Sequence, residues 1–235
     1  MRLGFEPFLP PLYKQVKVKL RRQVKLHNSK PSLLDVGGRK SPYTIGLQAK
    51  VTIIDLPRES EIQKNLNLGI NGNIIDEISK RRSNVENVIF GDMTRSELPS
   101  DSFDYVVAVE VLEHVEEDEL FVKEVARVLK TKGVFLMTTP NGDWLKNKNR
   151  DHKRHYKKKE LSDLLGKHFD EVVVDYAIAG GKYRKLGLKS WSLRHPVKTV
   201  LSMVGNVVNS LQSKNGELKH KVQGTHHLFA IAKKI

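Results

Sequence analysis

The sequence predicts an α/β protein built around a parallel β-sheet with helices on both faces, and three observations support this prediction. The segment Phe103–Val109 is almost wholly β-branched and aromatic, as is typical of a strand covered on both faces of a parallel sheet. Similar short apolar segments recur along the chain, and segments with apolar residues at helical spacing lie between most of them. The predicted strands are residues 32–36, 51–54, 85–90, 103–109, 134–138, 171–176 and 226–232.

The end of the Phe103–Val109 strand is the first candidate site. Glu110, Glu113 and His114 follow this strand directly. Ligands of open α/β sheets bind in the crevice beyond the carboxyl ends of the strands, so we expect any chemistry to occur here. The alternative is a core strand followed by a solvated acidic turn, and this segment alone does not decide between the two.

The first two predicted strands end in a second candidate site. Residues 32–36 run into Gly37 and Gly38, as a first strand runs into its ligand-facing turn. The second strand ends in Asp55, which lies 20 residues after Asp35. In dinucleotide-binding sheets an acidic residue at about this distance binds the ribose hydroxyls. Alternatively, Asp55 caps the helix that follows its strand.

The predicted helices differ in charge and continuity. The first is basic and amphipathic, because Val16, Leu20 and Val24 recur on one face among lysines and arginines. It is either a cover helix with a hydrated outer face or a contact for lipid or RNA. A later helical stretch carries turn signals at residues 68–73, so it is expected in two pieces. The predicted helices are residues 13–30, 58–82, 119–130 and 160–168.

The segment between the last two strands indicates a helical insertion, since it is far longer than the roughly 2–5 residues of a hairpin. Its apolar face must be buried against the parent domain as a lid, against a second copy, or in a membrane interface. Packing on the parent domain is the default for such a stripe. The apolar face comprises Trp191, Val197, Val200, Leu201, Val204, Val208 and Leu211. The flanking basic residues are Lys182, Arg184, Lys185, Lys189, Arg194 and Lys198.

Composition limits the function classes. The chain has 235 residues, of which 39% are apolar and 29% charged, as expected for one globular domain with an insertion. The absence of cysteine excludes disulfides, thiolate metal sites and a cysteine nucleophile. The nine histidines show no metal-ligand spacing, so no metal site is expected. The net charge of +14 favours nucleic acid, anionic lipid or phosphorylated substrates without choosing among them.

The ends and apolar stretches of the chain predict its location and organisation. Residues 1–11 lack the apolar core of a signal peptide, and no stretch of about 18 apolar residues occurs. A cytoplasmic protein is therefore expected, with peripheral contact to anionic membrane as an option. The predicted parts are a basic helical segment at 1–30, a core at 31–178, an insertion at 179–224 that acts as an acceptor lid, and a last core strand at 225–235.

The order of these parts resembles that of the class I S-adenosylmethionine-dependent methyltransferases, in particular their ubiquinone-biosynthesis-like (type 11/23) branch. Five segments carry the resemblance: Leu33–Gly38, Asp55, Gly91–Met93, Leu98–His114 and Val128–Gly142. The resemblance implies a Rossmann-like, seven-stranded, mostly parallel sheet with an antiparallel last strand and a helical insertion before it. The first motif departs from the family pattern, because two glycines stand where three usually alternate.

The resemblance also implies a set of site residues. Cofactor-binding roles fall to Asp35, Gly37 and Gly38 for the methionine part, Asp55 for the ribose, Asp92 and Met93 for the adenine, and Glu110. His152, Arg154 and Tyr156 match the His-x-Arg-x-aromatic pattern of relatives that act on sugars or small acceptors, so this loop is expected to be an active-site lid. In that pattern a helix cap follows, where this chain has Lys157.

These assignments predict an enzyme that uses S-adenosyl-L-methionine to methylate an oxygen of a small molecule or a sugar or glycan intermediate. A hydroxyl acceptor must lose a proton, and histidine has a suitable pKa. His152 is the expected base, with His155 and His114 as competitors, and Arg154 and Tyr156 are expected to bind the acceptor. An RNA methyltransferase and a non-catalytic binding protein on the same fold remain as alternatives. A nicotinamide dehydrogenase is disfavoured because Gly-x-Gly-x-x-Gly is absent after the first strand.

Overall fold

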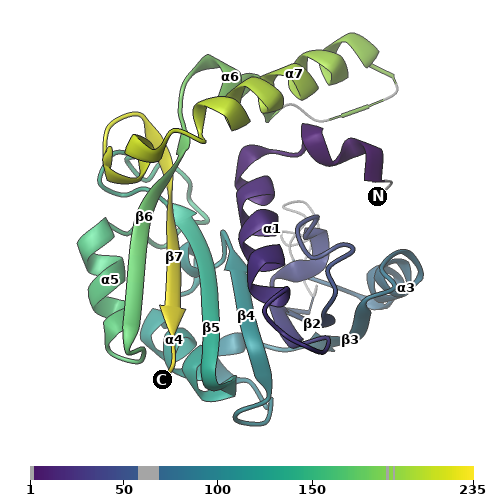
Figure 1. Cartoon of the computed structure of the whole chain (residues 1–235), viewed down its shortest axis with the longest axis vertical. Coiled ribbons are helices and arrows are strands. Elements are labelled where there is room, and N and C mark those ends of the chain that lie inside the picture. The colour runs from purple at the N-terminus through teal and green to yellow at the C-terminus, as the bar shows by residue number, and fades with distance from the viewer. Residues whose placement is uncertain (1–2, 58–68, 189–190, 193) are drawn as a thin grey trace.

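A seven-stranded sheet organises the described part of the chain (Figure 1). The computed structural model describes residues 3–57, 69–188, 191–192 and 194–235. The strand order is β3-β2-β1-β4-β5-β7-β6; β7 pairs antiparallel with β5 and β6, and all other pairs are parallel. The predicted fold class is therefore confirmed. The strands are β1 (Ser32–Val36), β2 (Lys50–Asp55), β3 (Val85–Phe90), β4 (Phe103–Val109), β5 (Leu129–Pro140), β6 (Glu171–Ala179) and β7 (Thr225–Lys233).

Strand β4 lies mid-sheet with the predicted bounds, between β1 and β5. Its neighbour β5 begins at Leu129, earlier than the predicted Val134. The preceding helix ends at Val128 rather than Lys130, because Leu129 already has the extended backbone that pairs with Phe103. Parallel pairing of β1, β4 and β5 brings their carboxyl ends to one edge of the sheet, where the candidate residues follow.

Helices cover both faces of the sheet. Helix α1 (Pro11–Val24) packs on one face through its predicted apolar stripe, and α3 (Gly72–Arg81) contributes Ile78 to the same core. Helices α4 (Asp118–Val128) and α5 (Lys158–Gly166) form the opposite core. Short 3₁₀ turns complete the fold: Leu3–Phe8, Gly38–Lys40, Met93–Arg95, Leu112–His114 and Gly216–His220. The first piece of the helix predicted at 58–82 lies outside the described residues.

The insertion between β6 and β7 forms α6 (Lys182–Gly187) and α7 (Pro196–Gln212). The default expectation for its apolar face was wrong, because Val197, Val204 and Leu211 on α7 are 70%, 50% and 61% exposed. The buried face of α7 is instead small and polar: Ser202, Gly205, Asn206, Asn209 and Ser210. Among the described residues no helix combines the length and apolarity needed to cross a membrane.

Candidate active site

The glycine turn after β1 is built around a buried carboxylate. Asp35 is fully buried, and its two oxygens accept hydrogen bonds from the hydroxyls of Tyr43 at 3.1 Å and Thr44 at 3.2 Å. A Cβ atom at Gly38 would lie 2.4 Å from the Asp35 carboxyl carbon, so only glycine fits there. Gly37 has φ +69°, which also favours glycine. The Asp35 side chain thus lies beneath the turn and holds it, and its predicted contact with the methionine part stays a prediction.

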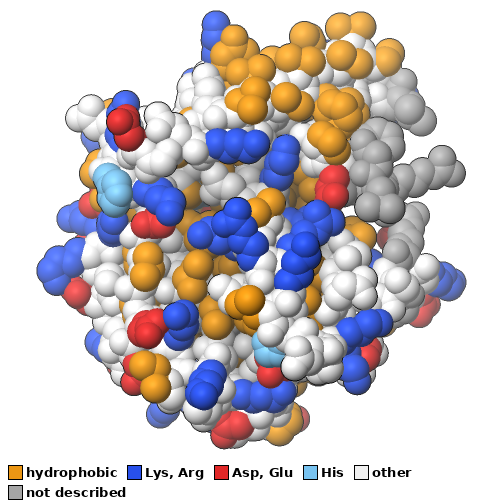
Figure 2. Space-filling model, viewed as in Figure 1, with side chains coloured by type: hydrophobic (Ala, Val, Ile, Leu, Met, Phe, Trp, Pro, Cys, Tyr) orange, Lys and Arg blue, Asp and Glu red, His pale blue; other side chains and the backbone are white. Residues whose placement is uncertain are grey.

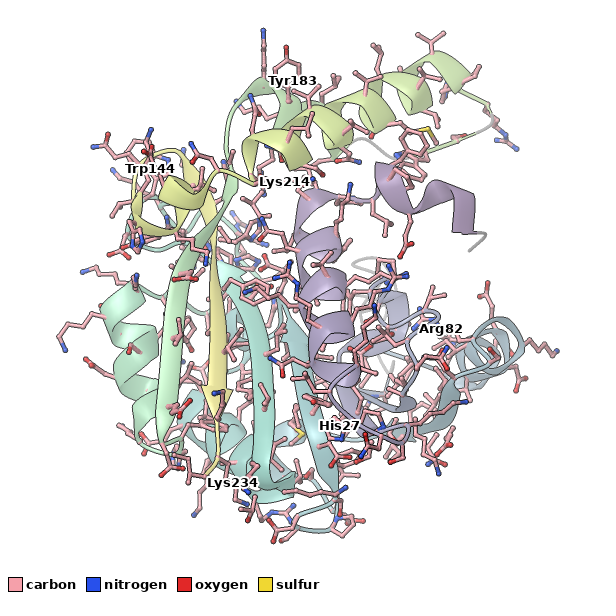
Figure 3. All side chains as sticks on the ribbon, viewed as in Figure 1. His27, Arg82, Trp144, Tyr183, Lys214 and Lys234 are labelled. Atoms are coloured by element: carbon pink, nitrogen blue, oxygen red, sulfur yellow. The ribbon has the colours of Figure 1, made fainter. Side chains whose placement is uncertain are left out.

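Arg82, a buried residue that follows α3 (Figure 3), also holds this turn. Its guanidinium donates to the carbonyl oxygens of Gly38 at 3.0 Å and Arg39 at 2.7 Å. Burial raises the pKa of Asp35 to about 6, although the nearby hydroxyls and the charge of Arg82 oppose this rise. A buried acid therefore supports the backbone that a ligand would approach.

The raised pKa of Asp35 predicts a change of stability with pH. The folded chain binds the proton of Asp35 more tightly than the unfolded chain, in which the pKa of this group is near 3.8. The contribution of this group is therefore fully present below pH 3.8 and is lost as the pH rises through about 6. Relative to Asp35→Asn, the wild type should gain on the order of 3 kcal/mol of unfolding free energy between neutral pH and pH 4. Urea titrations at several pH values measure this difference.

The matched control for that experiment is Asp163→Asn on the exposed surface of α5. A free-energy difference between wild type and Asp35→Asn that stays constant across this pH range would contradict the assignment of a buried, proton-holding Asp35.

The ends of β2 and β3 lie side by side at the same edge. The backbone N–H of Gly91 donates to the carbonyl of Asp55 at 3.1 Å. The Asp55 carboxylate is partly buried and accepts the N–H of Leu56 at 2.9 Å. Asp92 is exposed and caps the following turn through Thr94, whereas Met93 is buried. The structure thus brings the predicted ribose and adenine residues together.

Glu110 stands at the end of β4 with φ +56°, a backbone strain often found at functional sites. Its Oε1 accepts hydrogen bonds from Thr138 at 3.0 Å and from His227 Nδ1 at 3.2 Å. Arg184 of α6 donates to the other ring nitrogen of His227 at 3.4 Å. Burial alone would raise the pKa of Glu110. His227 and Thr138 outweigh this effect, so the pKa of Glu110 lies below its ordinary value. The insertion therefore reaches the strand-end site.

Glu113 is also fully buried, and its environment favours the neutral form. Burial and then the charge of Glu110 raise its pKa well above the ordinary value. Oε2 accepts a hydrogen bond from Thr139 at 3.1 Å, while Oε1 is buried without a hydrogen-bond partner. Its backbone carbonyl accepts the N–H of Lys153 at 2.7 Å, which anchors the loop 147–156 over the site.

Three imidazoles gather beside Glu113. His155 Nδ1 donates to the carbonyl of Leu145 at 3.2 Å, since a carbonyl can only accept. His155 Nε2 then accepts from His152 Nδ1 at 2.9 Å, and the Nε2 atom of His152 carries a lone pair. The ring of His114 lies edge-on to that of His152, with centroids 4.7 Å apart. Burial lowers the pKa of His152 most, and the neighbouring imidazoles lower it further.

The same cluster offers donors for a metal ion, although the sequence spacing predicts none. Ligand atoms of Glu113, His114 and His152 lie within 4.8 Å of one another. His114 Nδ1 is bound to the carbonyl of Asp151 at 3.0 Å, so its Nε2 is the atom left for a ligand. Two imidazoles and a carboxylate suit a divalent transition-metal ion.

Arg154 and Tyr156 hold the loop through hydrogen bonds to the start of α4 and the segment before it. Arg154 donates to Asp118 at 2.7 Å and to the carbonyl of Glu116 at 2.7 Å, and the hydroxyl of buried Tyr156 donates to Asp118 at 2.7 Å. These contacts position the loop, and the acceptor-binding roles of the two residues stay predictions. The missing cap at Lys157 is supplied from another loop, because Asp143 accepts the N–H of Lys158 at 2.8 Å.

Sequence reasoning missed several residues of this site. Thr138 and Thr139 bind the two glutamates, and their signal is a polar pair at the end of the apolar strand β5. His227 joins them because β7 pairs it opposite Pro140. Arg82 and Arg184 have no comparable signal, since each is one of many basic residues in the sequence.

Comparisons with known proteins agree with this geometry. Residues 34–137 match a methyltransferase domain family. The ubiquinone biosynthesis O-methyltransferase of Bartonella quintana is 23% identical over 158 residues, covering 59% of this chain and 57% of that protein. A probable S-adenosylmethionine-dependent methyltransferase of Mycolicibacterium smegmatis is 38% identical over 81 residues, 32% of this chain and 31% of its own.

Solved structures show the same fold. A SAM-dependent methyltransferase from Archaeoglobus fulgidus has a TM-score of 0.60 at 20% identity over 94% of both chains. Residues 34–137 therefore resemble a methyltransferase domain, and the described fold is that of solved S-adenosylmethionine-dependent methyltransferases. It spans about 57% of the length of the first curated relative. The family match runs from β1 to β5, so the histidine loop and the insertion lie outside it.

Proposed function

We propose that this methyltransferase transfers the methyl group of S-adenosylmethionine to an oxygen of a small acceptor, with His152 as the general base. The observation that supports this most is the relay Leu145–His155–His152, which fixes the tautomer of His152 and leaves Nε2 as a proton acceptor. A lowered pKa keeps His152 neutral near neutral pH. His155 acts as its positioning residue.

The carboxyl edge of the sheet fits the cofactor. Asp55 would accept hydrogen bonds from two ribose hydroxyls; it lies at the end of β2, next to the β3 end at Gly91. The turn at Gly37 and Gly38 presents backbone rather than side chains, since a Cβ at Gly38 is excluded by Asp35. When bound, the cofactor supplies a methyl group on a sulfonium sulfur for in-line displacement. The chain's residues align the acceptor oxygen, take its proton and exclude water.

The acceptor enters between the histidine loop and the insertion. Glu110, His227 and Arg184 are joined by hydrogen bonds beside the insertion, and the imidazole cluster belongs to the histidine loop and the turn after β4. The polar groups gathered there favour a small molecule or a sugar or glycan intermediate. RNA is the alternative that the net charge of +14 favours, and a non-catalytic binding protein would bind cofactor without turnover. Screening acceptor pools for a methyl mass shift with labelled cofactor separates these options.

Glu113, His114 and His152 support a second role, because Oε1 of Glu113 is buried without a partner. A divalent cation held there would activate the acceptor oxygen directly. With His152 as a base, dialysis against EDTA should leave turnover unchanged. A loss of turnover on dialysis that added Mg²⁺, Mn²⁺ or Zn²⁺ restores would assign the cluster to a metal instead. Glu113→Gln is the variant that tests this metal site, because glutamine keeps the shape of a neutral Glu113 but binds a metal ion more weakly.

A further inference from the structure

Helix α7 carries an apolar face that the described chain leaves uncovered. This outer face consists of Val197, Val200, Leu201, Val204 and Leu211, each at least 45% exposed. The residues recur at helical spacing, so they form one stripe of about 20 Å along the helix. Figure 2 shows hydrophobic side chains along α7 and a gathering of Lys and Arg side chains below them, over α1.

The opposite face of α7 fixes this orientation. Asn206 donates to the carbonyl of Phe8 at 3.0 Å, and Asn209 donates to the carbonyl of Ala179 at 2.7 Å. A Cβ at Gly205 would lie 3.0 Å from backbone atoms of α6, so the two helices touch closely. Rotating the stripe inward would break these hydrogen bonds and remove the side-chain donors from the carbonyls of Phe8 and Ala179. The exposed stripe is therefore a built feature of the fold.

The segment that carries the stripe has charges of one sign only. Residues 176–216 contain no aspartate or glutamate but seven lysines and arginines. Arg194 and Lys198 stand at the start of the stripe, and Lys214 lies just beyond its end (Figure 3); all three are exposed. Lys189, the other basic residue expected here, lies outside the described residues. Two copies of the chain would bring like charges together, so this pattern disfavours self-pairing. An RNA partner would leave the apolar stripe exposed to water.

We propose that the outer face of α7 docks this methyltransferase on an anionic lipid surface. The stripe would lie in the interface plane and the flanking cations would meet the lipid head groups. Helix α7 has 17 residues and lies on the membrane rather than across it. The insertion reaches the active site through Arg184, so docking would place the acceptor entrance close to the lipid surface.

Vesicle co-sedimentation of the full chain tests the proposal, with phosphatidylcholine vesicles with and without phosphatidylserine. The wild type should bind the anionic vesicles, and less so as salt is raised. The variant Val200→Ser/Leu201→Ser/Val204→Ser should bind them roughly tenfold or more weakly. The matched control, Leu26→Ser/Val173→Ser, removes exposed apolar residues from other elements and should bind like the wild type.

A charge variant tests the second half of the surface. Lys198→Gln/Lys214→Gln should weaken binding to anionic vesicles about thirtyfold, from the usual contribution of a cation near anionic lipid. Lys80→Gln/Lys123→Gln on α3 and α4 is its matched control. Equal binding of the wild type and both test variants would overturn the proposal. So would a wild-type dimer in lipid-free solution that becomes a monomer in the triple serine variant, because the stripe would then join two copies.

Discussion

Replacing His152 with alanine is expected to lower turnover by roughly 10²- to 10⁴-fold, the usual contribution of a general base. Cofactor affinity should be unchanged, because the ring lies on the loop 147–156 and not at the ends of β1 to β3. His155→Ala should give a smaller loss, since it removes only the acceptor that fixes the tautomer of His152. Single-turnover rates with saturating cofactor measure the chemical step directly.

The control for His152 is His220→Ala, an exposed histidine in the 3₁₀ turn before β7. Full turnover in His152→Ala, combined with loss in His114→Ala or His155→Ala, would move the base to another imidazole of the cluster. Loss in all three variants together with loss on metal removal would instead favour the cation.

Asp55→Ala is expected to weaken cofactor binding by on the order of 2–3 kcal/mol, or roughly 30- to 150-fold in dissociation constant. The reason is the loss of a carboxylate that would accept hydrogen bonds from two ribose hydroxyls at the end of β2. Calorimetric titration with the cofactor and with its demethylated product measures the change. Asp55→Asn keeps the shape and one hydrogen-bond acceptor, so its affinity for the cofactor should lie between those of the wild type and Asp55→Ala.

Asp76→Ala on the exposed surface of α3 is the control for Asp55, because it removes an aspartate that has no predicted role in binding. Equal losses in the two variants would indicate a general effect of removing a carboxylate, and unchanged affinity in Asp55→Ala would place the ribose site elsewhere.

Much of the fold follows from local patterns in the sequence. The bounds of β3 and β4 are as predicted, and the stripe of Val16, Leu20 and Val24 is buried as the helical spacing requires. Local patterns also place Asp55, Glu110 and Glu113 at strand ends, since a strand's carboxyl end is visible where an apolar run stops. Parallel pairing then brings them to one edge.

Roles that depend on distant partners could not be predicted in this way. Arg154 and Tyr156 match a substrate-binding pattern, yet both donate to Asp118 across more than 30 residues of chain. His227 reaches Glu110 from 117 residues away, through the antiparallel pairing of β7. Neither contact leaves a signal in the spacing of apolar residues.

The sequence alone therefore determined the element order, the sheet edge that carries the site and the existence of an apolar stripe in the insertion, because these depend on local periodicity. Only the tertiary structure decided which way α7 turns that stripe, how Asp35 is enclosed and how the imidazoles are ordered. The physical reason is that buried polar groups must find partners wherever the fold offers them. Asn206 and Asn209 find theirs at the carbonyls of Phe8 and Ala179, so the apolar face of α7 is left outside.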